Sequence, residues 1–282
     1  MGDIILKAED LFFSYDDEKS YSLNGLSLEI EKGKKVAFMG ANGSGKSTFF
    51  LCCNGIHRPT KGTLSIDGKP VDYSKKGLID LRTKVGIVFQ DPDNQLFSAS
   101  VTQEISFGAL NIGMSPEEAL EAVNKVIDIL EITPFAKRPT HSLSGGQKKQ
   151  VSIADVLVMN PEIIILDEST AALDPKHTTI VNKLVDILVS KGITVLMATH
   201  NVDYAYEWAD EVAVIHDGKT LLYGPPVEVF TNKEALKLTN LEQPAALELF
   251  NSLCQKGILD KTLPLPRSLK ELEEYISQIN PK

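Results

Sequence analysis

Short apolar runs alternate along this chain with segments in which apolar residues recur at helical spacing. Residues 11–15 and 26–30 alternate with a period of two, which predicts two half-buried antiparallel strands. The run from Val36 to Met39 is wholly apolar and is followed by a glycine, as is typical of a buried strand in a parallel sheet. A helix is predicted to follow from Lys46. Further strands beside Asp-Gly turns are predicted at residues 63–66 and 218–222.

Residues 101–159 are predicted to be mostly helical. One helix begins at Pro116, because proline is favoured in the first helical turn and the apolar residues after it recur at helical spacing. Apolar runs return at residues 163–166 and 193–197, and a helical pattern over residues 180–188 separates them. This strand–helix–strand order predicts a right-handed parallel α/β core.

The composition changes after Phe230. Helical patterns at residues 234–238, 245–253 and 269–279 are separated by prolines, which predicts a small helical domain over residues 231–282. One of these helices carries an apolar stripe that must be buried against something. Either it packs on the chain's own core or it packs across a two-fold axis and acts as a dimer hinge. The residues of the stripe are Ala246, Leu249, Phe250 and Leu253.

The overall composition is that of an ordinary soluble globular protein, with 43% hydrophobic and 24% charged residues among 282. The net charge of −9 argues against a nucleic-acid partner, which would require basic residues gathered on one face. Three cysteines, without framework spacing, indicate reduced thiols. No continuous apolar stretch approaches the length of a transmembrane helix. If the protein serves transport, we therefore expect another polypeptide to supply the pore.

A glycine-rich segment between a predicted strand and a predicted helix fits the phosphate-loop pattern G-x-x-x-x-G-K-[ST]. Its glycines let successive backbone N–H groups point at one anion, and the following helix adds its N-terminal dipole. Lys46 would reach the β- and γ-phosphates of ATP, and the Ser47 hydroxyl would bind Mg²⁺. An ordinary glycine-rich turn is the weaker alternative, given this context. The predicted nucleotide-binding residues are Gly40, Ala41, Asn42, Gly43, Ser44, Gly45, Lys46, Ser47 and Thr48.

The apolar run at residues 163–166 ends in two acidic residues. On a strand next to the phosphate loop, Asp167 would lie beside Mg²⁺ and Glu168 would face the attacking water as a general base. Two acids after a strand can also be no more than a solvated helix start. The phosphate loop in the same chain favours the catalytic interpretation.

Leu143, Ser144, Gly145, Gly146 and Gln147 form a second glycine-rich helix start, and therefore a second anion site. One nucleotide does not need two γ-phosphate cradles within a single chain. A head-to-tail dimer does, because each ATP then lies between the phosphate loop of one subunit and this segment of the other. The pentapeptide resembles the signature of the ABC ATPases.

Further residues match ABC ATPase elements in the expected order, and the resemblance covers about residues 4–230. It implies that Tyr15 stacks on adenine, although Tyr15 can also be read as a strand core residue. It implies that Gln90 contacts Mg²⁺ and the membrane subunit, and that His200 holds the γ-phosphate and the attacking water. The segment ending at Asp174 matches the loop that crosses the dimer interface. With Lys46 and Glu168, Gln90 and His200 complete the predicted catalytic set.

The family resemblance also implies an architecture and a set of partners. The expected fold is an α/β ABC ATPase core over residues 1–230, with an antiparallel β subdomain, a helical signature subdomain at about 98–160, and the helical domain 231–282. ATP and Mg²⁺ are the expected cofactors. A second ATPase subunit, identical or homologous, is the expected partner, together with a transmembrane coupling subunit and a substrate-specific membrane subunit. The implied location is peripheral, on the cytoplasmic face of the cell membrane.

Residues 90–97 look like the extended glutamine loop of importers of the energy-coupling-factor type, and they include a second glutamine, Gln95. Residues 138–141 are more like the cobalt and nickel members of that group than the vitamin members. The pattern at 241–244 resembles its C-terminal dimerisation domain. We therefore expect the ATPase of an importer for cobalt, or for a related metal or vitamin.

Three residues depart from the family pattern. Ser169 stands where proline is usual, Asp155 where glycine is usual, and Gln150 where a basic residue is usual. None of these changes removes a group that contacts phosphate or metal, and Asp155 and Gln150 are candidates for setting partner preference. A non-transport ABC ATPase of translation or DNA repair is the alternative function, but the chain has one cassette and no long coiled-coil insertion. A P-loop kinase would leave the signature and His200 unexplained.

Overall fold

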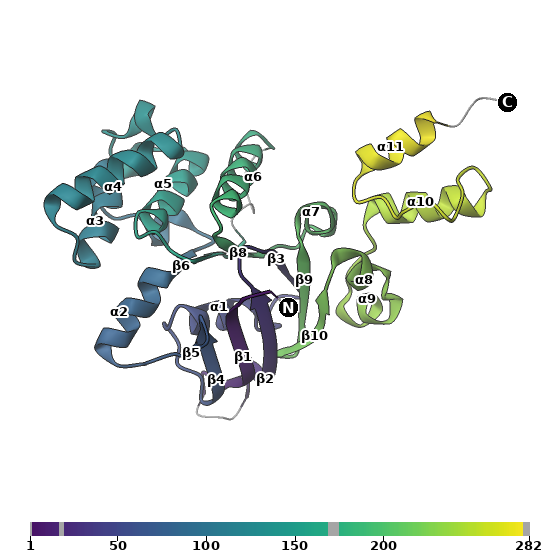
Figure 1. Cartoon of the computed structure of the whole chain (residues 1–282), viewed down its shortest axis with the longest axis horizontal. Coiled ribbons are helices and arrows are strands. Elements are labelled where there is room, and N and C mark those ends of the chain that lie inside the picture. The colour runs from purple at the N-terminus through teal and green to yellow at the C-terminus, as the bar shows by residue number, and fades with distance from the viewer. Residues whose placement is uncertain (1, 17–19, 169–174, 279–282) are drawn as a thin grey trace.

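The computed structural model describes residues 2–16, 20–168 and 175–278, and Figure 1 shows their arrangement. A four-stranded antiparallel sheet has the order β2-β1-β4-β5, and a six-stranded sheet has the order β10-β9-β3-β8-β7-β6. Strands β9, β3, β8, β7 and β6 run parallel, and β10 pairs with β9 in the antiparallel direction. The strands are β1 (Ile4–Phe13), β2 (Leu23–Glu31), β3 (Lys35–Met39), β4 (Lys61–Ile66), β5 (Lys69–Pro70), β6 (Val85–Val88), β7 (Ile163–Leu166), β8 (Thr194–Ala198), β9 (Glu211–His216) and β10 (Lys219–Gly224).

These strands confirm the predictions from the apolar patterns. The run at Val36–Met39 is a buried parallel strand, and β1 and β2 pair in the antiparallel direction as the alternation indicated. The helices are α1 (Lys46–Cys53), α2 (Lys75–Lys84), α3 (Val101–Asn111), α4 (Pro116–Ile129), α5 (Gly145–Leu157), α6 (Pro175–Ser190), α7 (Val202–Trp208), α8 (Pro226–Thr231), α9 (Lys233–Thr239), α10 (Ala245–Gln255) and α11 (Leu269–Ser277). Short 3₁₀ turns lie at residues 92–94, 133–135 and 140–142.

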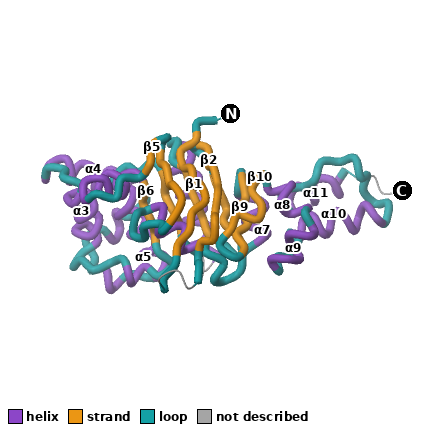
Figure 2. The backbone as a smooth tube through the Cα atoms, turned by 90° about the horizontal axis from the view of Figure 1, so that it is seen from below, coloured by secondary structure: helices purple, strands orange, loops and turns teal. Residues whose placement is uncertain are grey.

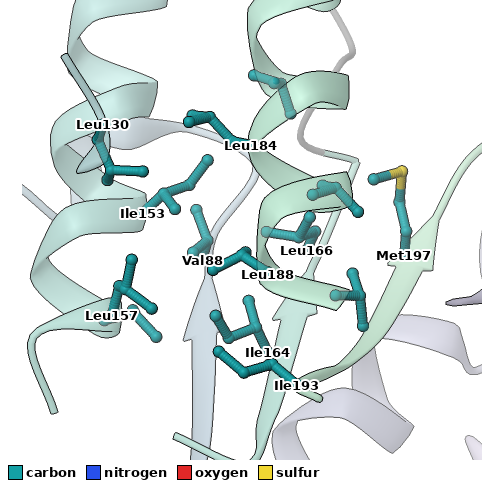
Figure 3. Packing of buried hydrophobic residues seen from close by; sticks show 14 of the residues in the cluster. Val88, Leu130, Ile153, Leu157, Ile164, Leu166, Leu184, Leu188, Ile193 and Met197 are labelled. Carbon is teal, nitrogen blue, oxygen red and sulfur yellow. The ribbon is translucent and has the colours of Figure 1, made fainter. Parts of the chain in front are cut away.

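The parallel sheet separates two hydrophobic clusters, because successive residues of a strand point to opposite faces. On β3, Val36 and Phe38 pack with α1 and the antiparallel sheet. Ala37 and Met39 belong to the other cluster, with the helices between residues 101 and 190. Figure 3 shows part of this second cluster, where Ile164 and Leu166 of β7 meet Leu184 and Leu188 of α6. Figure 2 shows the antiparallel sheet beside the helices α3 to α5. Strands buried on both faces explain why their sequences are continuously apolar.

The helical stretch predicted at residues 101–159 is confirmed as α3, α4 and α5. Helix α4 begins with Pro116 in its first turn, and Ser115 and Glu118 form a capping box at its N-terminus. Its buried face consists of Ala119, Val123, Val126 and Ile127, as the spacing indicated. In the described ranges, no helix is long and apolar enough to cross a lipid bilayer.

The last four helices extend from the edge of the larger sheet (Figure 1). Phe230, Leu236 and Leu247 join the main core, whereas Phe250 packs with Cys254, Leu259 and Leu272 in a small core of α10 and α11. Ala246 and Phe250 are thus buried within the chain, and Leu253 packs against the small core. This burial favours the alternative that Ala246 and Phe250 pack on the chain's own core, where Leu272 of α11 helps to cover Phe250. Leu249 remains 45% exposed.

Candidate nucleotide-binding and hydrolytic site

The phosphate loop (residues 40–47) connects the carboxyl end of β3 to the N-terminus of α1. Gly40, Gly43 and Gly45 have φ angles of 137°, 79° and 110°, which side chains rarely tolerate. A Cβ atom on Gly40 would lie 2.2 Å from the Ile215 carbonyl oxygen, and one on Gly45 would lie 2.6 Å from that of Ser22. The neighbouring strand ends therefore admit only glycine at these two positions.

Lys46 lies under this loop and is 6% exposed. Its ammonium group donates hydrogen bonds to the carbonyl oxygens of Gly40 (2.7 Å) and Ala41 (3.1 Å). Burial lowers the pKa of Lys46, while Glu168 and Asp167 oppose the shift. Among the described residues, the buried Ser44 hydroxyl has no hydrogen-bond partner. A cation and an unpartnered hydroxyl in a glycine loop at a helix N-terminus fit the phosphates of a nucleotide.

Asp167 follows β7, and its carboxylate interacts with the Ser47 side chain of the phosphate loop. Burial raises the pKa of Asp167, and the hydrogen bond from Ser47 and the charges of Lys46 and Lys149 oppose this effect. The described residues contain no group of three or more His, Cys, Asp or Glu side chains able to hold a metal ion. Mg²⁺ typically takes one or two protein oxygens and completes its shell with phosphate and water, and the Ser47–Asp167 pair fits that pattern.

Three predicted catalytic side chains meet at the Glu168 carboxylate. Gln90 donates from Nε2 to Oε2 of Glu168 (3.0 Å), and His200 Nε2 lies 2.8 Å from Oε1. The three residues follow the adjacent strands β6, β7 and β8, whose carboxyl ends share one edge of the sheet. Glu168 itself has a φ of 46°, an uncommon conformation for a residue with a side chain. The fold thus brings together residues that are up to 110 positions apart in the sequence.

Tyr15 lies just beyond β1 and is 61% exposed, so the interpretation of Tyr15 as a strand core residue is wrong. Its hydroxyl lies 3.3 Å from the Thr48 hydroxyl and 3.2 Å from His57 Nε2. The Tyr15 ring also stands edge-on to the rings of Phe13 and His57. The sequence pattern singled out Tyr15 and Thr48 but did not identify His57 as a neighbour of the tyrosine.

The signature residues surround the start of α5. Ser144 caps the helix by accepting from the backbone N–H of Gln147 (3.4 Å), while the Gln147 side chain accepts from the Ser144 N–H (3.1 Å). Leu143 is buried, and a side chain on Gly145 would meet open space. No hydrogen bond or ion pair between described residues joins the signature to the phosphate loop. Asp174, predicted to cross the dimer interface, and Ser169 lie outside the described residues.

Lys149 is a candidate positioning residue that the sequence did not single out. It is 2% exposed and donates from Nζ to the carbonyl oxygens of Phe89 (2.7 Å) and Gln90 (3.1 Å). Burial lowers the pKa of Lys149 to about 8. Gln150, the departure noted in the sequence, instead donates to the Leu130 carbonyl oxygen (3.3 Å). A basic residue thus supports the Gln90 backbone from position 149.

A groove of about 460 Å³ lies between α2, α3, α5 and the loop formed by residues 90–97. Asp155 lines it and accepts from Gln95 Nε2 (3.4 Å), and burial raises the pKa of Asp155 to about 7. Phe97 (67% exposed) and Phe107 (46% exposed) stand edge-to-face at 4.9 Å. Among the described residues that line this largely apolar groove, the aspartate at the customary glycine position is the only acid.

Replacing Tyr15 tests whether its ring is a platform for adenine. Tyr15→Ala should weaken ATP binding by about 1–3 kcal/mol, the usual contribution of stacking between a base and an aromatic ring. Tyr15→Phe and Tyr15→Trp should largely retain ATP affinity, since both keep a ring. Fluorescence titration with an ATP analogue measures the Kd, and inorganic tripolyphosphate serves as the control ligand because it has no base. Equal losses in all three variants would point away from stacking.

The acid in the groove predicts a pH-dependent stability. Because the pKa of Asp155 is raised in the folded state, the folded protein binds the proton more tightly, and stability falls as pH rises from about 4 to 7. Asp155→Asn should remove this loss and stabilise the chain above pH 7 by up to about 4 kcal/mol. Urea unfolding across pH 5–8.5 checks the slope, with exposed Glu121→Gln as the control. An unchanged slope in Asp155→Asn contradicts this account.

Comparison with known proteins agrees with the geometry of the site. A family model described as ABC transporter matches residues 23–171. The energy-coupling factor transporter ATP-binding protein EcfA of Methanocaldococcus jannaschii is 44% identical over 252 residues, 89% of this chain and 90% of that protein. A putative ABC transporter ATP-binding protein of Clostridium perfringens is 46% identical over 257 residues, 91% of this chain and 90% of that protein.

Solved structures extend the likeness. That of cbiO1 from Clostridium perfringens, described as part of the ABC transporter complex cbiONQ, has a TM-score of 0.76 and 44% identity, with 90% of this chain and 99% of that chain covered. A dimeric post-hydrolysis state of the ATP-binding cassette MJ0796, bound to ADP and Pi, has a TM-score of 0.70 and 28% identity, with 79% and 99% covered. The chain is therefore an ABC transporter ATPase, and it belongs to the ATP-binding proteins of energy-coupling factor transporters.

Proposed function

We propose that this chain hydrolyses Mg·ATP at the interface of a head-to-tail dimer and thereby powers uptake of cobalt, or of a related metal or vitamin, through separate membrane subunits. One observation carries the hydrolytic part of the proposal. The Glu168 carboxylate is held between Gln90 and His200, and its neighbour Asp167 interacts with Ser47 of the phosphate loop. A base, its orienting groups and a phosphate cradle are therefore contiguous.

In this proposal each residue has one role. Lys46 and the loop N–H groups bind the β- and γ-phosphates, and Ser47, Asp167 and the Gln90 amide oxygen hold Mg²⁺. Bound Mg²⁺ would neutralise charge on the phosphate oxygens. Glu168 accepts a proton from the attacking water, and its two hydrogen-bonded neighbours fix the carboxylate orientation. His200 orients the water and the γ-phosphate.

The signature supports the dimer. Its residues form a helix N-terminus, and a Cβ atom on Gly145 there would meet open space. A helix N-terminus of this kind binds anions. The dimer of the similar cassette MJ0796 provides precedent for such an assembly. We propose that Ser144 to Gln147 contact the γ-phosphate bound to the second subunit, and that Asp174 lies at the same interface.

The groove beside residues 90–97 is the proposed docking site of the transmembrane coupling subunit. Phe97 and Phe107 offer exposed aromatic area, and Asp155 contributes a carboxyl group to the lining of the same groove. Gln90 belongs to the same loop, so docking there and the state of the nucleotide site would be coupled directly. Such docking would place the chain at the cytoplasmic face of the membrane. The structurally similar cbiO1 is part of a transporter complex, which supports a membrane partner.

Coexpression with the membrane subunits encoded by neighbouring genes tests this function. The complex should copurify in detergent, and in vesicles loaded with ATP it should take up radioactive Co²⁺ or another cargo selected by the substrate subunit. Phe97→Ala should weaken copurification while preserving ATP binding, and exposed Leu120→Ala in α4 is the control. Failure of the parent chain to copurify with any scaffold would reject the transport proposal.

For residues 231–282 we propose a dimerisation role through the apolar side chains left exposed on α9 to α11. These are Leu238, Leu249, Leu269 and Ile276. A contact there would hold the subunits together while the nucleotide halves open. A chain ending at residue 230 should bind ATP yet be monomeric without it, and its turnover should depend steeply on protein concentration. Light scattering of the ATP-free truncated chain tests this role, since a persisting dimer would exclude it.

A further inference from the structure

Helix α7 begins two residues after His200, and the C-terminal helices hold it at both ends. At its first turn, Asp203 Oδ1 accepts a hydrogen bond from the backbone N–H of Ala245 (2.7 Å), the first residue of α10. Pro244 precedes α10 and supplies no side-chain cap. Asp203 therefore satisfies a backbone group that the start of a helix leaves free. Figure 1 shows α7 beside the six-stranded sheet, on the side where α8 and α10 lie.

At the other end of α7, a single arginine contacts the last carbonyl groups. Arg267 donates to the carbonyl oxygens of Tyr206 (2.7 Å), Glu207 (3.3 Å) and Ala209 (2.8 Å). Its guanidinium also lies over the Tyr206 ring, 5.3 Å from the centroid. A cation is favoured at the negative end of a helix, and the planar guanidinium can bond several carbonyls at once. The backbone N–H of Arg267 donates to Glu271 Oε2 (2.6 Å), and this hydrogen bond links the arginine to α11.

The N-terminal end of α7 directly follows the hydrolytic residue His200. Asn201 caps α7 by accepting from the Tyr204 N–H (2.9 Å), and its own N–H donates to the Thr199 hydroxyl (3.1 Å). His200 is therefore held between β8 and α7, with its ring 2.8 Å from Glu168. Lys46 and Tyr15 belong to other elements, so a shift of α7 would displace His200 and leave the nucleotide-binding contacts in place.

We propose that Arg267 and Asp203 are positioning residues for hydrolysis, which act through α7 to set where His200 stands against Glu168. The C-terminal helices then control turnover as well as packing, because any change that releases Arg267 also frees α7, the helix that directly follows the histidine. This inference rests on the hydrolytic role proposed above for His200.

Arg267→Ala in the full-length chain is the first test, with exposed Lys270→Ala in α11 as the matched control. A small displacement of a catalytic group is costly, so kcat should fall roughly 10-fold, whereas the KM for ATP should stay within about twofold. Arg267→Lys should recover part of the rate, because an ammonium group can still bond the carbonyls. Rates are compared at protein concentrations where light scattering shows equal dimer fractions, which removes any effect of dissociation.

The same substitution in a His200→Ala background separates positioning from general damage. In single-turnover hydrolysis with enzyme in excess, Arg267→Ala should cause no further loss once the histidine is absent. Hydrogen exchange of residues 199–208 should rise in Arg267→Ala, while exchange of β7 stays unchanged. Equal losses in both backgrounds, or unchanged kcat and unchanged exchange, would overturn the inference. Parent-like hydrolysis by His200→Ala alone would instead reject the role proposed for His200.

Discussion

Glu168→Gln should bind ATP normally and lose about 10²–10⁴-fold in turnover, the usual contribution of a general base. The amide keeps the shape of the carboxylate and can still hydrogen-bond one of its two neighbours, Gln90 or His200, but it cannot take a proton from water. Because the γ-phosphate then remains uncleaved, it should continue to bridge two subunits. Light scattering with ATP should therefore show a dimer that persists, and a phosphate-release assay gives the rate.

A matched control for this substitution lies at the other end of the same strand. Glu162 precedes β7, where it pairs with Lys32 (3.0 Å). Glu162→Gln removes the same charge at the opposite edge of the sheet and should leave turnover near the parent rate. Near-normal hydrolysis by Glu168→Gln would exclude Glu168 as the base, and a monomer in the presence of ATP would exclude the bridging model.

Lys46→Ala should act on binding before chemistry. Removing one member of a buried, hydrogen-bonded charge pair costs about 2–5 kcal/mol, so the Kd for ATP should rise roughly 30- to 5,000-fold. The structure adds a second reason, since the ammonium group also bonds two carbonyl oxygens of the phosphate loop and helps to hold its curve. Isothermal titration calorimetry measures the affinity directly.

Two measurements keep this result interpretable. Exposed Lys76→Ala in α2 controls for the loss of a positive charge from the surface. Circular dichroism and urea unfolding show whether the loop variant remains folded. Unchanged ATP affinity in a folded Lys46→Ala protein would mean that the nucleotide binds elsewhere, and that result would remove the basis for the whole site.

Much of the site was predictable because its signals are local. The phosphate loop is a run of glycines whose conformations a turn between strand and helix requires, and Gly40 and Gly45 face backbone oxygens that admit no side chain. The buried strands are continuously apolar because both faces of the sheet are covered. The start of α4 is likewise encoded by adjacent residues, the helix cap Ser115 and Pro116 in the first turn. Each of these patterns depends on neighbours in the sequence.

Other features depended on which distant surfaces meet. Periodicity placed Tyr15 on a strand, but β1 ends before it and the ring is exposed. The apolar stripe of α10 predicted that these side chains are buried but did not predict which surface covers them. In the structure, α11 packs against Phe250.

The contacts around Glu168 and the two ends of α7 join residues far apart in the chain, and no local pattern encodes such pairs. The amino-acid sequence thus determined the elements, the nucleotide cradle and the family. The tertiary structure decided which side chains meet, because a side chain's partner is set by the packing of whole elements and not by its neighbours in the chain.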